Sequence, residues 1–417
     1  MALTKRSFIV GGANTNFIGK SHPDFIWKKH PDFGKKENPT WEELLQEAVD
    51  GLISETGVNP EDIDKLFLGN FTGELFVNQG HMGAALVGTH PAFANKPSMR
   101  VEGACASGGL AIMAALDSIA AGADMVLVAG VEVQTTVSAR DGGDFLARAS
   151  HYSRQRSIDD FTFPALFGRR SKAYREAFGV DADAIDAVSI KAYANANKNP
   201  KAHMKAVKMD AESAANSPIF LSNEEYKPFV KISDCSQVSD GASALLLVSE
   251  AGLAKLGKSI AEAVEVVGRG HSVASLYEDG DLTRLTTSAD AVAKAYSEAG
   301  VSANEIDIAE VHDCFAITEV MMYEAAGFAA PGKGGELAAS GETGINGRIP
   351  VNTGGGLIGF GHPVGATGVK QALEIFRQMK GQCGDYQVPF TPKYGLTINM
   401  GGDDKTVVSL VLANGAQ

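Results

Sequence analysis

The sequence predicts an α/β fold in which strands alternate with helices and parallel sheets are covered on both faces. Two observations point to this class. Short β-branched runs alternate with helical patterns along the chain, which is typical of βαβ units. A passage from the first part of the chain also recurs in the second half, which indicates a diverged internal duplication. With 417 residues, the chain is long enough for two or three hydrophobic cores.

The duplicated unit runs from a strand through a helix to a second strand. In the first copy, a capping box at Thr40 predicts the helix start and Gly57 its end, and in the second copy Gly300 ends the helix. The same Gly-Val…Ile-Asp pattern follows each helix at the same offset, which favours duplication over a chance likeness of two α/β segments. The matching strand runs begin at Ser7 and Val264, and those that close the copies begin at Asp124 and Thr406.

A basic, aromatic-rich stretch separates the two copies. We interpret residues 134–225 as an inserted lid of helices and long loops. The predicted domains are therefore residues 1–133 plus 226–262, residues 134–225 and residues 263–417. The cationic side chains of the lid would form either a phosphate-binding face or a solvated surface; they are Arg140, Arg148, Arg154, Arg156, Arg169, Arg170, Lys172 and Arg175. An earlier loop, residues 21–36, contains the tetrapeptide His-Pro-Asp-Phe twice, and no function is assigned to it.

Composition and charge exclude several classes of function. The formal charge is 37 − 50 = −13, which argues against a general nucleic-acid or anionic-membrane binder. The four cysteines show neither a disulfide framework nor a zinc-binding spacing, so no metal is expected. No run approaches the roughly 20 apolar residues of a membrane-spanning helix. The N-terminal apolar run is too short for a signal peptide, the C-terminus is not a peroxisomal tail, and the cytoplasm is the expected compartment.

Cys105 is the first candidate catalytic residue. A short β-like run leads into it, small residues follow, and an apolar helix begins directly afterwards, which predicts a thiol at a helix N-terminus. Unpaired N–H groups and the helix dipole favour a thiolate there, and strained turns of this kind carry covalent nucleophiles. The competing interpretation is a buried structural cysteine. The strand–cysteine–helix context favours the nucleophile.

Three further segments supply candidate partners for this thiol. His362 lies in a glycine-dense turn before a helix, where backbone can pack closely against a ligand. His312, Asp313 and Cys314 follow a buried strand, at the sheet end where α/β proteins place their sites. A core thiol and a helix cap are the alternative interpretation of that segment. The strand from Leu396 runs into a glycine pair, which is suited to presenting backbone N–H groups to an oxyanion.

Together these segments resemble those of the thiolase superfamily, and specifically the sterol-carrier-protein-2 type of thiolase. The matching stretches cover most of the chain in the family's order. They are Gly103-Ala-Cys-Ala-Ser-Gly-Gly, Asp234-Cys-Ser-Gln-Val-Ser-Asp-Gly-Ala-Ser-Ala, His312-Asp-Cys-Phe and Gly354-Gly-Gly-Leu-Ile-Gly-Phe-Gly-His-Pro-Val-Gly-Ala-Thr-Gly. The resemblance implies two βαβαβαββ halves stacked as five layers, αβαβα, with a loop domain over the site. It also implies a homodimer or a dimer of dimers.

The resemblance further implies a reaction and a role for each candidate residue. Cys105 would accept an acyl group from acyl-CoA, with His362 taking its proton and helping to bind the thioester oxygen. Cys314 would deprotonate the α-carbon of a second acyl-CoA, or protonate that carbon in the reverse direction. His312 would position a water or donate to an oxyanion, and backbone N–H groups of Cys105 and Gly401 would form a second oxyanion hole. CoA and acyl-CoA are then substrates, no bound cofactor is expected, and the setting is lipid metabolism.

Two departures from the family pattern are visible in the sequence. Many thiolases carry an acid/base cysteine in a Cys-x-Gly motif near the C-terminus, where this chain has Asn399-Met-Gly. The sterol-carrier type also lacks that cysteine, and Cys314 would fill the gap. Asp403 and Asp404 follow the glycine pair in place of an apolar continuation.

Two other functions remain open at this point. An acylated Cys105 would also serve a decarboxylating ketosynthase or an acetyltransferase with a non-CoA acceptor, but Cys314 would then lack a task. Relatives of this type often sit with a small OB-fold, zinc-containing protein, so the chain could be a subunit of a hetero-complex. The retained Cys105 argues against the aldolases among them, which can dispense with the nucleophile.

Overall fold

The strands that the structure describes form one mixed sheet. The computed structural model describes residues 5–415, and the predictions made from the two chain ends fall partly on residues 1–4 and 416–417, outside this range. The strand order is β3-β2-β4-β5-β1-β6-β9-β8-β7. The strand bounds are β1 (Ser7–Asn14), β2 (Lys65–Gly69), β3 (Ser98–Val101), β4 (Met125–Glu132), β5 (Gly241–Ser249), β6 (Val264–Val273), β7 (Ile308–Glu310), β8 (Tyr394–Gly401) and β9 (Thr406–Asn414).

This sheet consists of two halves with the same strand order. The N-terminal half runs β3-β2-β4-β5-β1, and the C-terminal half runs β7-β8-β9-β6. Val351 forms a parallel bridge to Ala309 of β7, in the place that β3 takes beside β2. The halves join where Phe8 and Ile9 of β1 pair with the start of β6. The predicted internal duplication is therefore confirmed by the topology.

The prediction of purely parallel sheets is wrong for two strands. β5 is antiparallel to β4 and β1, and β9 is antiparallel to β8 and β6, whereas β2, β3 and β4 are parallel to one another, as are β7 and β8. β9 follows β8 after the short turn of residues 402–405, and so short a connection permits only an antiparallel return. Apolar patterns reveal a strand but not its direction, which explains the error.

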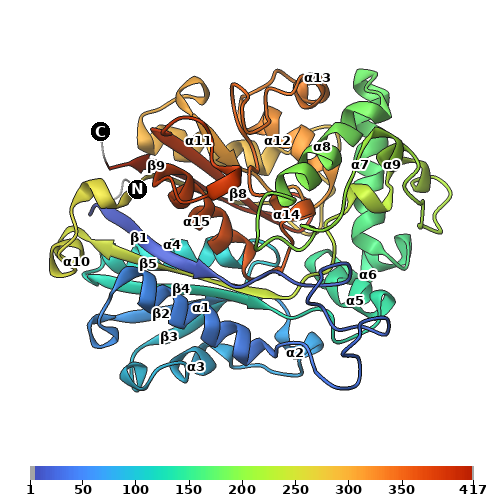
Figure 1. Cartoon of the computed structure of the whole chain (residues 1–417). Helices are drawn as coiled ribbons and strands as arrows, with labels where there is room; N and C mark the ends of the chain where they lie inside the picture. The colour runs from blue at the N-terminus through green and yellow to red at the C-terminus, as the bar shows by residue number, and fades with distance from the viewer. Residues whose placement is uncertain (1–4, 416–417) are drawn as a thin grey trace.

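Helices cover the sheet in the five-layer arrangement that the resemblance implied (Figure 1). α4 (Ser107–Ala120) and α15 (Thr367–Met379) lie in the middle layer, where each contacts strands of both halves. α1 (Trp41–Thr56) packs on the outer face of the N-terminal half, and α11 (Thr286–Ala299) on that of the C-terminal half, beside α12 (Ala316–Ala325). A buried apolar cluster from α4, α15 and both half-sheets fills the middle layer. The two halves therefore share one core.

The predicted ends of the two outer helices agree with the structure. Thr40 Oγ1 accepts a hydrogen bond from the Glu43 N–H at 3.2 Å, and the Glu43 carboxylate accepts one from the Thr40 N–H at 2.8 Å. This reciprocal pair is the capping box expected at the start of α1. α1 ends at Gly57 with φ +69° and α11 at Gly300 with φ +68°, a left-handed conformation that glycine adopts without strain.

Residues 134–225 form a largely helical region beside the C-terminal half (Figure 1, green). Its helices are α5 (Ala139–Leu146), α6 (Tyr152–Gln155), α7 (Thr162–Phe178), α8 (Ala182–Ala196) and α9 (Ala211–Ala215). The other short helices are α2 (Gly73–Phe76), α3 (Met82–Val87), α10 (Glu250–Lys255), α13 (Gly334–Ala339) and α14 (Gly356–Gly359). Within residues 5–415, no helix has the length and apolar character needed to cross a membrane. The division into three domains stays a prediction.

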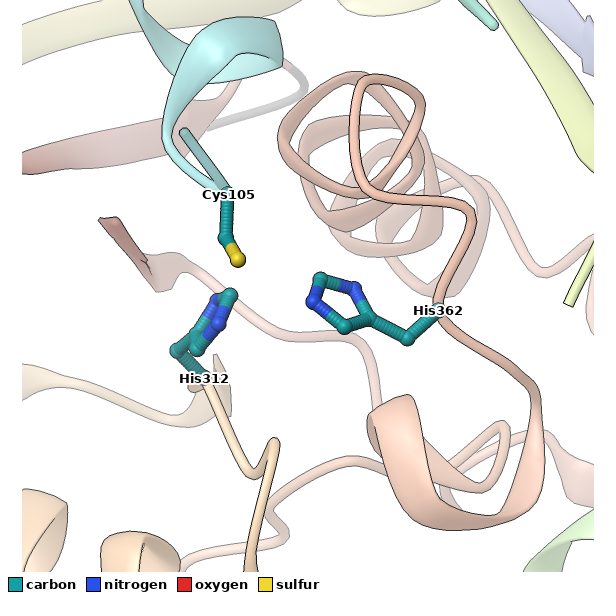
Figure 2. Close-up of side chains that lie close together, drawn as sticks. All are labelled: Cys105, His312 and His362. Atoms are coloured by element: carbon teal, nitrogen blue, oxygen red, sulfur yellow. The ribbon is translucent and has the colours of Figure 1, made fainter. Parts of the chain in front are cut away.

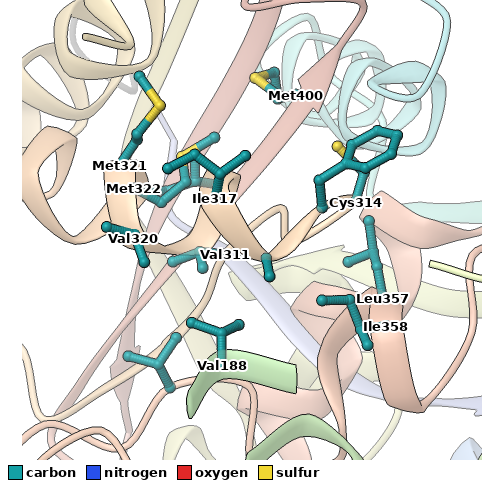
Figure 3. Packing of buried hydrophobic residues seen from close by; sticks show 14 of the residues in the cluster. Val188, Val311, Cys314, Ile317, Val320, Met321, Met322, Leu357, Ile358 and Met400 are labelled. Carbon is teal, nitrogen blue, oxygen red and sulfur yellow. The ribbon is translucent and has the colours of Figure 1, made fainter. Parts of the chain in front are cut away.

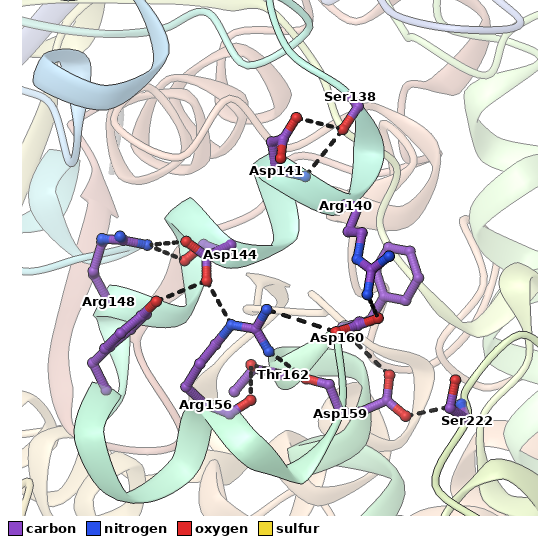
Figure 4. A network of polar contacts seen from close by, with 12 residues as sticks. Ser138, Arg140, Asp141, Asp144, Arg148, Arg156, Asp159, Asp160, Thr162 and Ser222 are labelled. Atoms are coloured by element: carbon purple, nitrogen blue, oxygen red, sulfur yellow. Dashed lines mark hydrogen bonds and ion pairs between the residues drawn. The ribbon is translucent and has the colours of Figure 1, made fainter.

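Most cationic side chains of this region are paired with carboxylates (Figure 4). Arg156 and Arg148 share Asp144, and they hold the pKa of that carboxyl well below its usual range. The pairs are Arg140–Asp160, Arg148–Asp144, Arg156–Asp144, Arg169–Asp279, Arg170–Asp403 and Lys172–Glu225. The positive charge predicted to form a phosphate-binding face is thus largely neutralised by nearby carboxylates.

The repeated tetrapeptide forms the same turn in both places. Nδ1 of His22 and Nδ1 of His30 each accept a hydrogen bond from the N–H two residues later, at 3.1 Å. In both copies the phenylalanine N–H donates to the histidine carbonyl. A third copy with alanine in place of aspartate begins at His90 and makes the same two bonds. The repeat is therefore explained as a turn-forming unit.

Candidate active site

Cys105 lies on a tight turn between β3 and α4, as predicted. Ala104, the residue before it, has φ +53°, a conformation that costs a non-glycine residue about 1–3 kcal/mol. Ser107 stabilises the turn, because its hydroxyl accepts from the Gly103 N–H at 3.0 Å and donates to the Ala104 carbonyl at 2.6 Å. The Glu102 carboxylate accepts from the Ala104 N–H at 2.6 Å. Strain of this kind is typical of turns that present a nucleophile.

The resting site holds Cys105 as a thiol. Although the residue is partly exposed, burial of its surroundings raises the pKa of the thiol to about 12. The Gly402 N–H acts in the opposite direction, and the carboxylates of Glu132 and Glu102 raise the pKa further. Burial thus outweighs the helix N-terminus, which the sequence predicted to favour a thiolate. The sulfur therefore needs a base beside it.

His362 provides an unprotonated ring nitrogen. Its Nδ1 lies 2.6 Å from the hydroxyl oxygen of Thr367, and that hydroxyl donates to the Pro363 carbonyl at 3.0 Å. The Thr367 oxygen must therefore accept from an Nδ1–H group, which leaves a lone pair on Nε2. Burial lowers the pKa of His362 to about 3, and the charge of Lys370 lowers it further, so the ring is neutral. His362 accordingly has the form that a general base requires.

His312 completes a group of three side chains that point toward one another (Figure 2). One ligand atom each of Cys105, His312 and His362 lies within 4.8 Å of the other two. The two imidazole rings are 5.1 Å apart between centroids, at an interplanar angle of 85°. Within the described chain, Nε2 of both histidines is buried without a hydrogen-bond partner. Burial also holds the pKa of His312 well below its usual range.

Cys314 lies close to this group but is not part of it. Its side chain is buried before the start of α12, at the edge of an apolar cluster that includes Met400 and Leu357 (Figure 3). The Cys314 sulfur is 3.9 Å from the Thr318 hydroxyl. Burial raises the pKa of the Cys314 thiol well above its usual range, and Cys105 raises it further. The two sulfurs are therefore near enough to interact, and Cys314 is a thiol in the resting site.

A thiol and two imidazoles at this spacing are also a group of side chains able to bind a metal ion such as Zn²⁺. The sequence predicted that no metal is needed, and that statement stays a prediction.

Comparison with known protein families identifies the fold and this constellation. The model of the thiolase N-terminal domain matches residues 31–251, and a model described as thiolase C-terminal domain-like matches residues 268–414. The chain belongs to the thiolase family. The resemblance seen in the sequence is therefore confirmed.

Relatives of this thiolase-family chain include two archaeal proteins named acetyl-CoA acetyltransferase. The protein from Methanothermobacter thermautotrophicus is 33% identical over 368 residues, which cover 88% of this chain and 93% of the relative. The protein from Methanocaldococcus jannaschii is 34% identical over 382 residues, which cover 90% and 94%. Human sterol carrier protein 2 is 27% identical over 426 residues, which cover 98% of this chain and 72% of that protein.

A solved structure titled "Ltp2-ChsH2(DUF35) aldolase" has the same fold. It aligns with a TM-score of 0.79 over 98% of each chain at 20% sequence identity. Identity at this level shows the thiolase fold alone.

Two glycines bring the end of β8 against the nucleophile turn of this thiolase fold. A Cβ on Gly401 would lie 2.1 Å from the Gly103 carbonyl oxygen, so only glycine permits this approach. The next residue, Gly402, has its N–H at the Cys105 thiol. The sequence pointed to Gly401 and not to Gly402, because one sequence position of offset cannot be seen without coordinates. The role of Gly401 in an oxyanion hole stays a prediction.

Asp403 and Asp404 hold the same turn in place. The Asp403 carboxylate pairs with the buried guanidinium of Arg170 from α7, which also donates to the carbonyl oxygens of Asp281 and Arg284 at 2.9 and 3.1 Å. Asp404 accepts from backbone N–H groups at the start of α11, at 2.9 and 3.0 Å. The acidic residues that depart from the family pattern thus connect the turn to the lid and to the C-terminal half.

Glu132 is a buried residue of the site that the sequence did not single out. Its carboxylate accepts from the N–H groups of Phe71, Thr72 and Gly365, at 2.9, 3.2 and 3.0 Å. Burial raises the pKa of Glu132 to about 7 although these three bonds lower it. Because Gly365 follows His362 in the same loop, Glu132 attaches that loop to the N-terminal half. A glutamate at the end of the otherwise apolar run 125–131 was the available signal.

Proposed function

We propose that the chain is a CoA-dependent thiolase that forms or cleaves a 3-oxoacyl-CoA through an acyl-Cys105 intermediate. The observation that carries this proposal is the Cys105 thiol grouped with the unpartnered Nε2 of His362. A thioester exchanges its acyl group with a thiol when a base removes the thiol proton. Membership of the thiolase family and the relatives named acetyl-CoA acetyltransferase support the same assignment.

In the first step, His362 Nε2 takes the Cys105 proton while the sulfur attacks the carbonyl carbon of acyl-CoA. The bond between that carbon and the CoA sulfur then breaks, and the departing CoA thiolate takes the proton from His362. Backbone N–H groups at the start of α4 and in the glycine pair would stabilise the oxyanion. The product is acyl-Cys105 and free CoA.

Carbon–carbon chemistry requires the second sulfur. In the degradative direction, the Cys105 thiolate attacks the 3-oxo carbon, the bond to the α-carbon breaks, and the Cys314 thiol gives its proton to the carbanion of the departing acetyl-CoA. Synthesis reverses these steps, with the Cys314 thiolate removing the α-proton. The dry, apolar surroundings of Cys314 suit a thiol that must hold its proton until the carbanion forms. His312 would donate to the oxygen that carries the carbanion charge.

Intact-protein mass spectrometry after exposure to a panel of acyl-CoAs tests this function. The wild type should gain the mass of one acyl group, and Cys105→Ala should gain none. Cys383→Ala is the matched control, because Cys383 is a buried cysteine of the middle-layer cluster and should leave the adduct unchanged. An adduct of the same yield on Cys105→Ala would disprove the assignment of the nucleophile.

We further propose that the enzyme works as a homodimer or dimer of dimers and takes a small OB-fold partner. The support is the solved structure whose title joins a thiolase-fold chain to a DUF35 protein, and it bears on the fold alone. Purification from the native source should retain the partner through size-exclusion chromatography. A fully active homodimer without it would contradict the hetero-complex and leave the thiolase assignment standing.

A further inference from the structure

We propose that Asn399 is a positioning residue that places the His312 proton on Nε2, so that one histidine of the site is a donor and the other an acceptor. The consequence for catalysis rests on the proposed thiolase function. The placement of the proton is a property of the resting protein and is tested without substrate.

The orientation of the Asn399 amide is determined by two bonds on either side of it. Its Oδ1 accepts from the Gly109 N–H at 3.0 Å, and its Nδ2 donates to the Cys105 carbonyl at 2.9 Å. Exchanging oxygen and nitrogen would place donor against donor and acceptor against acceptor. Nδ2 is therefore the end of the amide that faces the nucleophile turn.

Glycines on both middle-layer helices form the cradle of this amide. A Cβ on Gly368 of α15 would lie 2.3 Å from Asn399 Oδ1, and one on Gly109 of α4 would lie 2.8 Å from it. Asn399 is 2% exposed, so the amide cannot rotate into solvent. Close packing thus holds one orientation.

The same Nδ2 lies 3.4 Å from Nδ1 of His312. An amide nitrogen carries only donor hydrogens, so His312 Nδ1 must accept and the ring proton resides on Nε2. That Nε2 is buried and, within residues 5–415, has no partner. It therefore offers an N–H to the site.

His362 has the opposite arrangement, since Thr367 takes its Nδ1–H and leaves a lone pair on Nε2. The two neutral rings next to Cys105 thus differ in function: His362 accepts a proton, and His312 donates a hydrogen bond to a developing oxyanion. The difference arises from Asn399 and Thr367, because the rings themselves are chemically identical.

The test is the ¹⁵N NMR spectrum of the imidazoles in the resting full-length protein, with His312 assigned from its absence in His312→Gln. The wild type should show the Nε2–H form. In Asn399→Asp, a carboxylate that only accepts should move the proton to Nδ1, and in Asn399→Ala the Nε2–H population should fall. Gln371→Glu is the matched control: it exchanges a buried amide, bonded to the Ile398 carbonyl at 3.1 Å, for a carboxylate and should leave His312 unchanged.

An Nδ1–H form in the wild type, or an unchanged His312 in both Asn399 variants, would overturn the proposal. Thiolysis should fall about 10²-fold in Asn399→Asp if His312 donates to an oxyanion. A proton shift in a protein that shows no thiolase activity would contradict the proposed function and leave the role of Asn399 intact. A proton shift with unchanged thiolysis would remove His312 as the oxyanion donor.

Discussion

The two histidines of the site are neutral because they are buried, and their neighbours decide what each can do. Burial lowers the pKa of His362 to about 3 and holds that of His312 well below its usual range. Neither ring therefore gains a charge near neutral pH. Acid/base function in this site arises from which nitrogen holds the proton.

Thr367→Val tests this claim for the base. Valine has the shape of threonine but cannot accept the Nδ1–H of His362, so Nε2 should lose its lone pair in part of the population. The rate of Cys105 acylation in a single turnover, followed by quenched-flow mass spectrometry, should fall about 10²-fold. Thr367→Ser keeps the hydroxyl and should acylate at nearly the wild-type rate. Equal rates for the valine and serine variants would show that Thr367 does not position the base.

The active site depends on the close approach of α4 and α15. α4 begins at the Cys105 turn, and α15 begins five residues after His362. A Cβ on Gly368 would lie 2.2 Å from the Gly109 nitrogen, and one on Gly108 would lie 2.9 Å from the Gly365 oxygen. Glycines at this crossing therefore determine the distance between nucleophile and base.

Gly368→Ala should push the two helices apart. Overpacking of a tight core contact costs about 1–3 kcal/mol, so the free energy of unfolding in urea should fall by that amount. Acylation of Cys105 should fall as well, because the Asn399 cradle and the His362 loop move with α15. Gly280→Ala is the control, since a Cβ there meets no atom within 4 Å and the residue has no positive φ. Equal stability and activity of the two alanine variants would contradict this account of the crossing.

Local patterns predicted the helix ends and the nucleophile turn, and they failed where the chain pairs with itself over long distances. Thr40 and Gly57 act on groups within four residues, so α1 could be delimited from the sequence. Thr367 lies five residues after His362, near enough for a local search to have found it. Asn399 bonds to partners 290 and 294 residues away, and no spacing in the sequence reveals such contacts.

The direction of β5 and β9 was missed for a related reason. An apolar run records that a strand is buried, whereas its direction depends on how the connecting segment returns to the sheet. For β5 that segment contains the whole of residues 134–225, which the sequence identified as an insertion without its path.

At the scale of the whole molecule, the site exists only because the two halves stack on each other. The N-terminal half contributes Cys105 on α4, and the C-terminal half contributes His312, Cys314 and His362. Glu132 of β4 bonds to the loop of His362 across this boundary. The duplication thus places a nucleophile from one copy against acid/base groups from the other, which is the arrangement that carbon–carbon chemistry between two acyl groups requires.

The partition of activity in Cys314→Ala tests the central claim most directly. The measurement pairs the mass of acyl-Cys105 with the exchange of the α-protons of acetyl-CoA in D₂O, in the wild type, in Cys314→Ala and in a Cys235→Ala control. We expect acyl-Cys105 to form normally in all three, while proton exchange and condensation fall at least about 10²-fold in Cys314→Ala alone. Condensation and exchange at the wild-type rate in Cys314→Ala would contradict the account.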